Sequence, residues 1–60
     1  MAVVCTYEER EEDEVVSTGR MTLDLPPAVG DVLRLGRRRV RVEDVLPLSR
    51  DEVRVVLQRL

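Results

Sequence analysis

The chain has 60 residues, enough for one small domain over residues 1–60 with a thin hydrophobic core. It contains one cysteine and no histidine, so it lacks the residues for an internal disulfide or an ordinary structural zinc site. Its net charge of −2 is far from the strongly basic balance of typical nucleic-acid-binding domains. No apolar run approaches 18 residues and no signal peptide is visible, so we expect a soluble, cytoplasmic protein without a membrane partner.

The charges are unequally shared between the two halves of the chain. Residues 1–30 carry seven acids and two arginines, whereas residues 31–60 carry five acids and eight arginines. Arginine supplies all the positive charge, because lysine is absent, and this bias indicates a GC-rich genome rather than a function. The number of arginines alone is therefore weak evidence for a binding site.

The first expected element is a strand over residues 2–7, AVVCTY, because valine, threonine and tyrosine favour pleated structure. In a strand, Val3, Cys5 and Tyr7 share one face, which we expect to point into the core. Residues 8–14, EEREEDE, place six acids in seven positions. Repulsion between these acids predicts an exposed loop, whose alternative roles are a cation site or a contact with a basic partner.

A second strand is expected around Met21, Leu23 and Leu25, which alternate with polar residues as in a half-buried strand. Gly19 falls in the middle of the expected strand segment VVSTGRMTLDL, residues 15–25, and predicts a bulge or a sharp bend. Residues 26–31, PPAVGD, then combine two prolines with Gly-Asp, which predicts a turn-rich connection.

The stretch LRLGRRRVRV, residues 33–42, predicts a hairpin around Gly36. A two-residue Gly36-Arg37 turn pairs Leu35 with Arg38, whereas a four-residue loop over residues 36–39 pairs Leu35 with Val40. The second register opposes more apolar residues, and we therefore favour it.

The last segment, residues 50–60, fits two structures. A capping box at Ser49 and Glu52, followed by apolar residues at helical spacing, favours a helix. Alternation of Val53, Val55 and Leu57 favours a strand, which would also complete a five-stranded sheet. We prefer the strand and keep the C-terminal helix as the alternative.

Five short strands in this order predict a mainly β fold, namely a small five-stranded SH3-like barrel or a strongly bent antiparallel sheet. The stretch VGDVLRLGRRRVRVEDV, residues 29–45, resembles KOW-type modules in its G-D-x-V, glycine and V-x-V pattern. The resemblance implies that Gly30-Asp31 lead into a strand and that Gly36 lies at the tip of the next hairpin. It also implies binding, because KOW-type modules bind RNA, ribosomal proteins or the transcription machinery.

The arginines of this hairpin are the candidate partner- or phosphate-binding residues: Arg34, Arg37, Arg38, Arg39 and Arg41. Guanidinium groups gathered at a tip can hold phosphates or carboxylates bidentately, but a solvated hairpin without a ligand has the same pattern. If residues 37–39 form an exposed loop, replacing all three arginines by serine should barely change folding. If they are instead paired with the acidic run, the same change should unfold the protein.

The sequence offers little for catalysis. Cys5 has no histidine or lysine to activate it, and we expect a buried core thiol. No metal-ligand spacing or cofactor motif occurs, so we expect neither a metal nor a cofactor. We predict a non-enzymatic protein-interaction or assembly module whose partner is another protein or a second copy. The alternative is an RNA- or DNA-binding module that uses residues 34–41.

We also expect a homo-oligomer, because the core is small and the apolar first strand was a candidate for a sheet edge.

Overall fold

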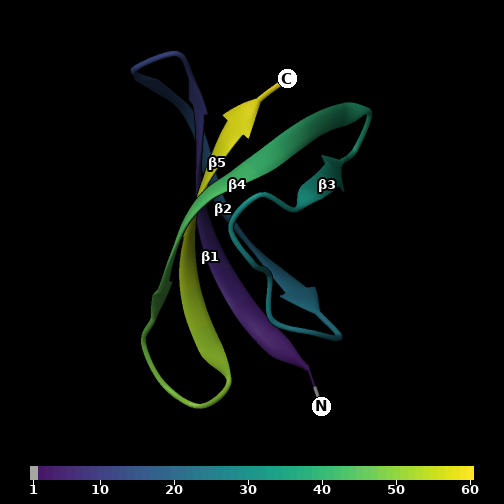
Figure 1. The fold of residues 1–60 in the computed structure, drawn as a ribbon, viewed down its shortest axis with the longest axis vertical. Coiled ribbons are helices and arrows are strands. Elements are labelled where there is room, and N and C mark those ends of the chain that lie inside the picture. Colours follow the sequence, from purple (N-terminus) through teal and green to yellow (C-terminus); the bar gives the residue numbers. More distant parts are fainter. Residues whose placement is uncertain (1) are drawn as a thin grey trace.

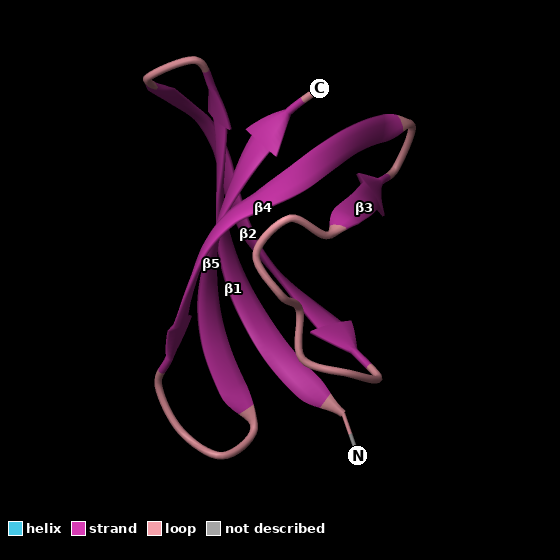
Figure 2. Ribbon diagram, in the orientation of Figure 1, coloured by secondary structure: helices cyan, strands magenta, loops and turns pink. Residues whose placement is uncertain are grey.

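A computed structural model describes residues 2–60 (Figure 1). Within this range the chain forms five strands: β1 (Val3–Glu11), β2 (Glu14–Leu23), β3 (Val32–Leu35), β4 (Arg38–Pro47) and β5 (Glu52–Arg59). Residues 2–60 contain no helix (Figure 2), and hence no helix long and apolar enough to cross a membrane. The mainly β prediction is confirmed, and the last segment is the strand rather than the helix.

The strands form one curled sheet in the order β2-β1-β5-β4-β3. The sheet turns through about 200° and makes a half-barrel, as the prediction of a strongly bent sheet or small barrel requires. β1 and β5 run parallel to each other, whereas the other neighbouring pairs are antiparallel, so the sheet is mixed and the predicted purely antiparallel pairing is wrong for β1 and β5. β1 lies between β2 and β5, and the expectation that the first strand lies at an edge is therefore wrong; β2 and β3 are the edges.

The core lies on the inner face of the curled sheet and is made by alternate residues of the three central strands. Its buried apolar side chains are Val3, Cys5, Val40, Val42, Val53, Val55 and Leu57. Tyr7 packs against this cluster, so the expected inner face of the first strand is correct. Burial of these aliphatic side chains is the main force that holds the sheet in its bend.

The acidic run forms a hairpin, so the prediction of a loop over residues 8–14 is wrong. β1 continues to Glu11, and a two-residue turn at Glu12 and Asp13 leads into β2. The repulsion within the run is relieved by arginines, one of which is close by in the sequence. Arg10 pairs with Glu8 at 2.6 Å, and arginines of β4 and β5 pair with Glu9. Only the turn at Glu12 and Asp13 is an exposed acidic loop of the kind that the sequence predicts.

Gly19 lies in regular pairing opposite Tyr7, and the predicted bulge at Gly19 is wrong. The irregularity of the β1–β2 pair lies between Glu9 and Arg10 instead. A Cβ atom on Gly19 would stand 2.6 Å from Tyr7 Oη, which is closer than such atoms approach. Glycine is therefore needed here because the tyrosine ring lies across it.

We expect the substitution Gly19→Ala to displace the Tyr7 ring and to lower the free energy of unfolding by about 1–3 kcal/mol, the usual cost of overpacking. Tyr7 is the only aromatic residue, so the near-ultraviolet circular dichroism of the protein reports on this ring alone. Thr18→Ala, at the exposed neighbouring position, is the control and should leave the spectrum unchanged. An unaltered spectrum and stability in the Gly19→Ala protein would contradict the close contact.

The β3–β4 hairpin has the two-residue turn, and the four-residue loop that we favoured is wrong. Leu35 pairs with Arg38 and Leu33 with Val40. Gly36 has a φ of +61°, and a glycine with positive φ at the first turn position is the pattern of a type II′ turn. The turn thus lies at Gly36, as the KOW-type resemblance implied, but Arg38 and Arg39 belong to β4 rather than to a loop.

The connection between β2 and β3 has the expected turn. The Asp31 amide donates to the Ala28 carbonyl at 3.0 Å, and Gly30 adopts a φ of +96°. The Gly30 amide donates to the Val42 carbonyl, and the Val42 amide donates to the Asp31 carbonyl, both at 2.8 Å. These bonds extend the β3–β4 pairing and fix the position of the hairpin on the sheet.

Candidate binding surface at the arginine-rich hairpin

The five arginines of residues 34–41 divide between the two faces of the sheet. Val40 and Val42 point into the core, so Arg38 also lies on the inner face and Arg39 and Arg41 lie on the outer face. Arg34, the Cα partner of Arg39, shares the outer face. Strand alternation, rather than a flexible loop, therefore decides what each arginine contacts.

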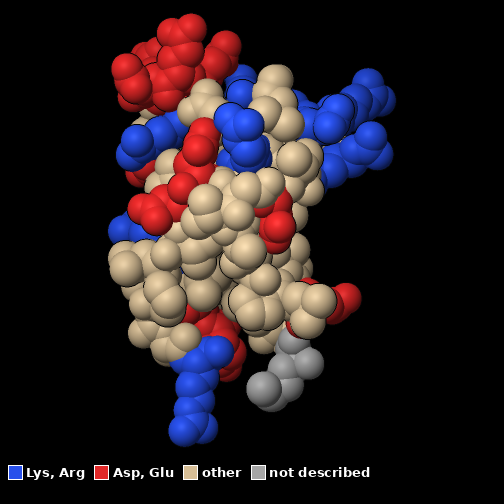
Figure 3. All heavy atoms as spheres, in the orientation of Figure 1, with Lys and Arg blue, Asp and Glu red and all other residues tan. Residues whose placement is uncertain are grey.

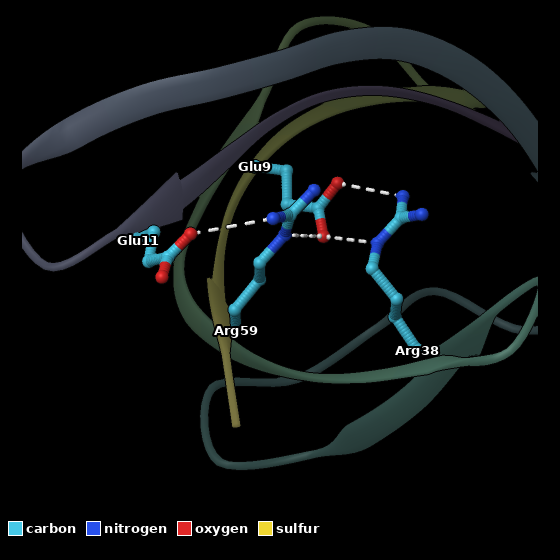
Figure 4. A network of polar contacts seen from close by, with 4 residues as sticks. All are labelled: Glu9, Glu11, Arg38 and Arg59. Carbon is cyan, nitrogen blue, oxygen red and sulfur yellow. Dashed lines mark hydrogen bonds and ion pairs between the residues drawn. The ribbon is translucent and has the colours of Figure 1, made fainter.

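The inner-face arginine belongs to a group of charged residues that closes one end of the core. We call this group the ionic cap; its members are Glu9, Glu11, Arg38 and Arg59 (Figure 4). They continue the inward columns of β1, β4 and β5 beyond the last apolar residues. The core therefore ends in ion pairs at this end of the half-barrel.

Glu9 is the centre of the ionic cap, and its side chain is fully covered. Arg38 binds it in a bidentate manner, with Nε donating to Oε2 and Nη2 to Oε1, both at 3.0 Å. Arg59 Nε donates to Oε2 at 2.9 Å, and Arg59 Nη1 donates to Glu11 Oε2 at 3.3 Å. Both arginine side chains remain partly exposed, so the carboxylate is covered by its own partners.

The electrostatics of the ionic cap favour the charged forms of Glu9 and Arg38. The bond from Arg38 holds the pKa of Glu9 below its ordinary value, and Arg59 acts in the same direction, while burial opposes both. The same bond to Glu9 raises the pKa of Arg38. The cap is therefore an internally satisfied cluster of charges.

The lowered pKa of Glu9 predicts a pH dependence of stability. A carboxyl group whose pKa is lower in the folded state stabilises the protein above its unfolded-state pKa, which is about 4.3 for glutamate, and loses this contribution as the pH falls further. The difference in unfolding free energy between the wild type and Glu9→Gln should therefore be largest at neutral pH and shrink as the pH falls below the unfolded-state pKa of glutamate. Urea unfolding of both proteins at several pH values measures it, and a constant difference would contradict the ionised, paired state of Glu9.

The arginines that lack a carboxylate partner form a separate surface. We call it the arginine patch; it consists of Arg34, Arg37 and Arg39, which are exposed and form no ion pair with any residue of the described range 2–60. Arg41 differs from them, because it lies 3.6 Å from Glu43. Arg34 and Arg39 stand directly opposite each other across β3 and β4. Like charges in this arrangement destabilise a sheet unless an anion lies between or beside them.

A shallow hollow of about 310 Å³ joins the arginine patch to the ionic cap. Its lining residues are Arg37, Arg38, Arg39, Arg59 and Leu60. Because Arg38 and Arg59 already hold Glu9, the positive charge that is free to meet a ligand comes from the turn side of the hollow. The hollow is suited to a carboxylate or phosphate group that enters beside the β3–β4 turn.

Two groups of charged side chains lie at the end of the molecule that carries the ionic cap. Figure 3 shows a dense group of acidic side chains at the upper left and a group of basic side chains at the upper right, with a mostly uncharged middle and further charged side chains at the left and at the bottom. The ribbon places the β1–β2 turn and the β3–β4 turn at these two positions, with the end of β5 between them (Figure 1). The arginine patch thus lies at one side of this end and the acidic turn at the other.

Sequence reasoning identified the arginines but missed Glu9 and Arg59. The signal that could have identified these two residues is the alternation of inward and outward side chains along each strand. The inward column of Val3, Cys5 and Tyr7 continues to Glu9, and that of Val55 and Leu57 continues to Arg59. The prediction of a loop over residues 8–14 interrupts the first column before it reaches the carboxylate of Glu9.

Other chemistry is sparse in the described part of the chain. Cys5 is fully buried, as expected for a core thiol, and burial raises the pKa of this thiol. Among residues 2–60, no group of three or more His, Cys, Asp or Glu residues is placed to hold a metal ion.

Comparison with known proteins gives no relative. No protein-family model, no curated protein and no solved structure matches this chain. The function must therefore be inferred from the geometry and charge of the surface itself.

Proposed function

We propose that the protein is a non-enzymatic protein-interaction module that acts in the cytoplasm and binds an acidic protein segment through the arginine patch. The observation that carries the proposal is the set of three exposed arginines without a carboxylate partner in the described chain, two of which directly oppose each other. A carboxylate-bearing partner relieves this repulsion and accepts bidentate hydrogen bonds from the guanidinium groups. Arg38 and Arg41 contribute less, because carboxylates of the same chain already engage them.

Two features favour a protein segment over a nucleic acid. The acidic turn lies at the same end of the molecule and repels a long polyanion (Figure 3). The only aromatic residue, Tyr7, is half-buried against the core and does not line the hollow beside the arginine patch, so no aromatic ring stands there for a base to stack on.

Binding of RNA or DNA by the hairpin is the second candidate. It is supported by the resemblance of residues 29–45 to KOW-type modules, which implies RNA or the transcription machinery as partners. It shares the same arginines with the first candidate. A comparison of ligands on the same variants therefore separates the two.

The experiment is a titration of the protein with a peptide rich in aspartate and glutamate and, in parallel, with a single-stranded RNA of equal charge. We expect the peptide to bind more tightly than the RNA. The triple substitution Arg34→Gln, Arg37→Gln, Arg39→Gln should reduce peptide binding about tenfold or more, since each charge-assisted contact contributes on the order of 1 kcal/mol. Tighter binding of the RNA would favour the second candidate instead.

A second triple variant controls for net charge. It replaces three other exposed arginines that form no ion pair within residues 2–60, namely Arg20, Arg50 and Arg54, by glutamine. This variant loses the same three positive charges but keeps the arginine patch. Equal loss of peptide binding in both variants would show that net charge, and not the arginine patch, attracts the peptide.

A further inference from the structure

The turn between β1 and β2, here called the acidic turn, carries carboxylates that could pair with the guanidinium groups of the arginine patch. We use this name for Glu12, Asp13 and Glu14, which are exposed and form no ion pair with any residue of the described range. Three carboxylates thus lie on one side of the end of the molecule that carries the ionic cap, and three guanidinium groups lie on its other side. The two sets are equal in number and opposite in charge.

The acidic turn is held in a defined conformation. Glu12 has a φ of +58°, in the left-handed region that side chains other than glycine rarely adopt. With its amide oriented to satisfy both groups, Gln58 of β5 donates to the Glu12 carbonyl at 3.2 Å and accepts from the Glu12 amide at 2.9 Å. These contacts tie the turn to the end of β5, so its carboxylates are presented from a fixed backbone.

We propose that a second copy of this chain is an occupant of the arginine patch, with the acidic turn of each copy docked on the arginine patch of the other. The inference rests on the proposed function, because it uses the same arginines, and it names the partner. The two turns lie on opposite sides of the same end of the long axis (Figure 1). Consider a two-fold axis just beyond this end that is perpendicular both to the long axis and to the line joining the two turns. It places the two copies end to end, with the acidic turn of each copy next to the arginine patch of the other.

Such a contact is closed and self-complementary, as a two-fold dimer requires. The molecule measures 30 × 20 × 19 Å, so an end-to-end contact buries less surface than a standard protein interface. Association through charged groups alone is also screened by salt. We therefore infer a weak dimer that forms at high protein concentration and dissociates as the salt concentration rises.

The test is sedimentation equilibrium at high micromolar concentration, at about 0.05 M and about 0.5 M salt, since the Debye length falls severalfold over this range. The wild type should dimerise at low salt and be largely monomeric at high salt. Two charge-reversed proteins sharpen the test: Asp13→Arg with Glu14→Arg, and Arg37→Glu with Arg39→Glu. Each should be monomeric alone, because its two turns then carry the same sign. An equimolar mixture of the two should restore the dimer.

The matched control is Arg50→Glu with Arg54→Glu, which changes the net charge as the second variant does but leaves both turns intact. It should dimerise like the wild type, and circular dichroism should confirm that every variant is folded. A monomeric wild type, a mixture that stays monomeric, or reversed variants that still dimerise alone would each overturn the two-fold contact. If the acidic peptide nevertheless binds the arginine patch in such a case, the proposed function stands and only its assignment to a second copy fails.

Discussion

Replacing Glu9 by glutamine is expected to lower the free energy of unfolding by about 2–3 kcal/mol at neutral pH, since hydrogen bonds to charged groups are worth about 1.5–3 kcal/mol. The substitution keeps the shape of the side chain but leaves Arg38 and Arg59 facing each other without a carboxylate between them. A domain of 60 residues has a total stability of only about 3–9 kcal/mol, so the loss is a large fraction of it. Thermal unfolding should show a midpoint lowered by about 10 °C or more.

Glu12→Gln is the matched control for this prediction. It makes the same chemical change three positions along the chain, at an exposed carboxylate of the turn. Its effect should stay within about 0.5 kcal/mol, as for ordinary surface substitutions. Equal stabilities of the Glu9→Gln and Glu12→Gln proteins would show that the ionic cap contributes nothing to the fold.

Arg38→Gln should destabilise the protein, because it removes the bidentate partner of a covered carboxylate. For the same reason, joint replacement of residues 37–39 by serine should no longer be harmless. The earlier expectation assumed that all three arginines lie in an exposed loop, whereas Arg38 points to Glu9.

The neighbouring substitution Arg39→Gln provides the comparison within the same hairpin. Arg39 is exposed, has no carboxylate partner in the described chain and opposes Arg34, so its loss should be neutral or slightly stabilising. Chemical denaturation of the two single variants measures the difference. A larger effect at position 39 than at position 38 would reverse the assignment of the two arginines.

The sequence was sufficient for those parts of the fold that depend on local alternation. Val53, Val55 and Leu57 predicted β5, and Val3 and Cys5 predicted the inner face of β1, because each set alternates strictly and is uninterrupted. The parallel pairing of β1 with β5 was not predicted, since it joins segments that are about fifty residues apart and no local pattern specifies it.

The predicted register of the β3–β4 hairpin is wrong for a related reason. Pairing Leu35 with Arg38 looks unfavourable when only the hairpin is considered, and it is acceptable because Glu9, from a distant strand, neutralises the arginine. The candidate site was therefore predicted only in part. The cluster of arginines is visible in the sequence, but which of them are already paired depends on strand parity and on a carboxylate 29 positions away.

The central claim is that Arg34, Arg37 and Arg39 bind the partner while Arg38 and Arg59 hold the fold. The most direct test follows the Nε–Hε signals of the arginines by nuclear magnetic resonance during titration with the acidic peptide. We predict that the signals of Arg34, Arg37 and Arg39 move with peptide concentration, whereas those of Arg38 and Arg59 stay in place because Glu9 already accepts their protons. Movement of the Arg38 and Arg59 signals alone, or of none of the five, would contradict the claim.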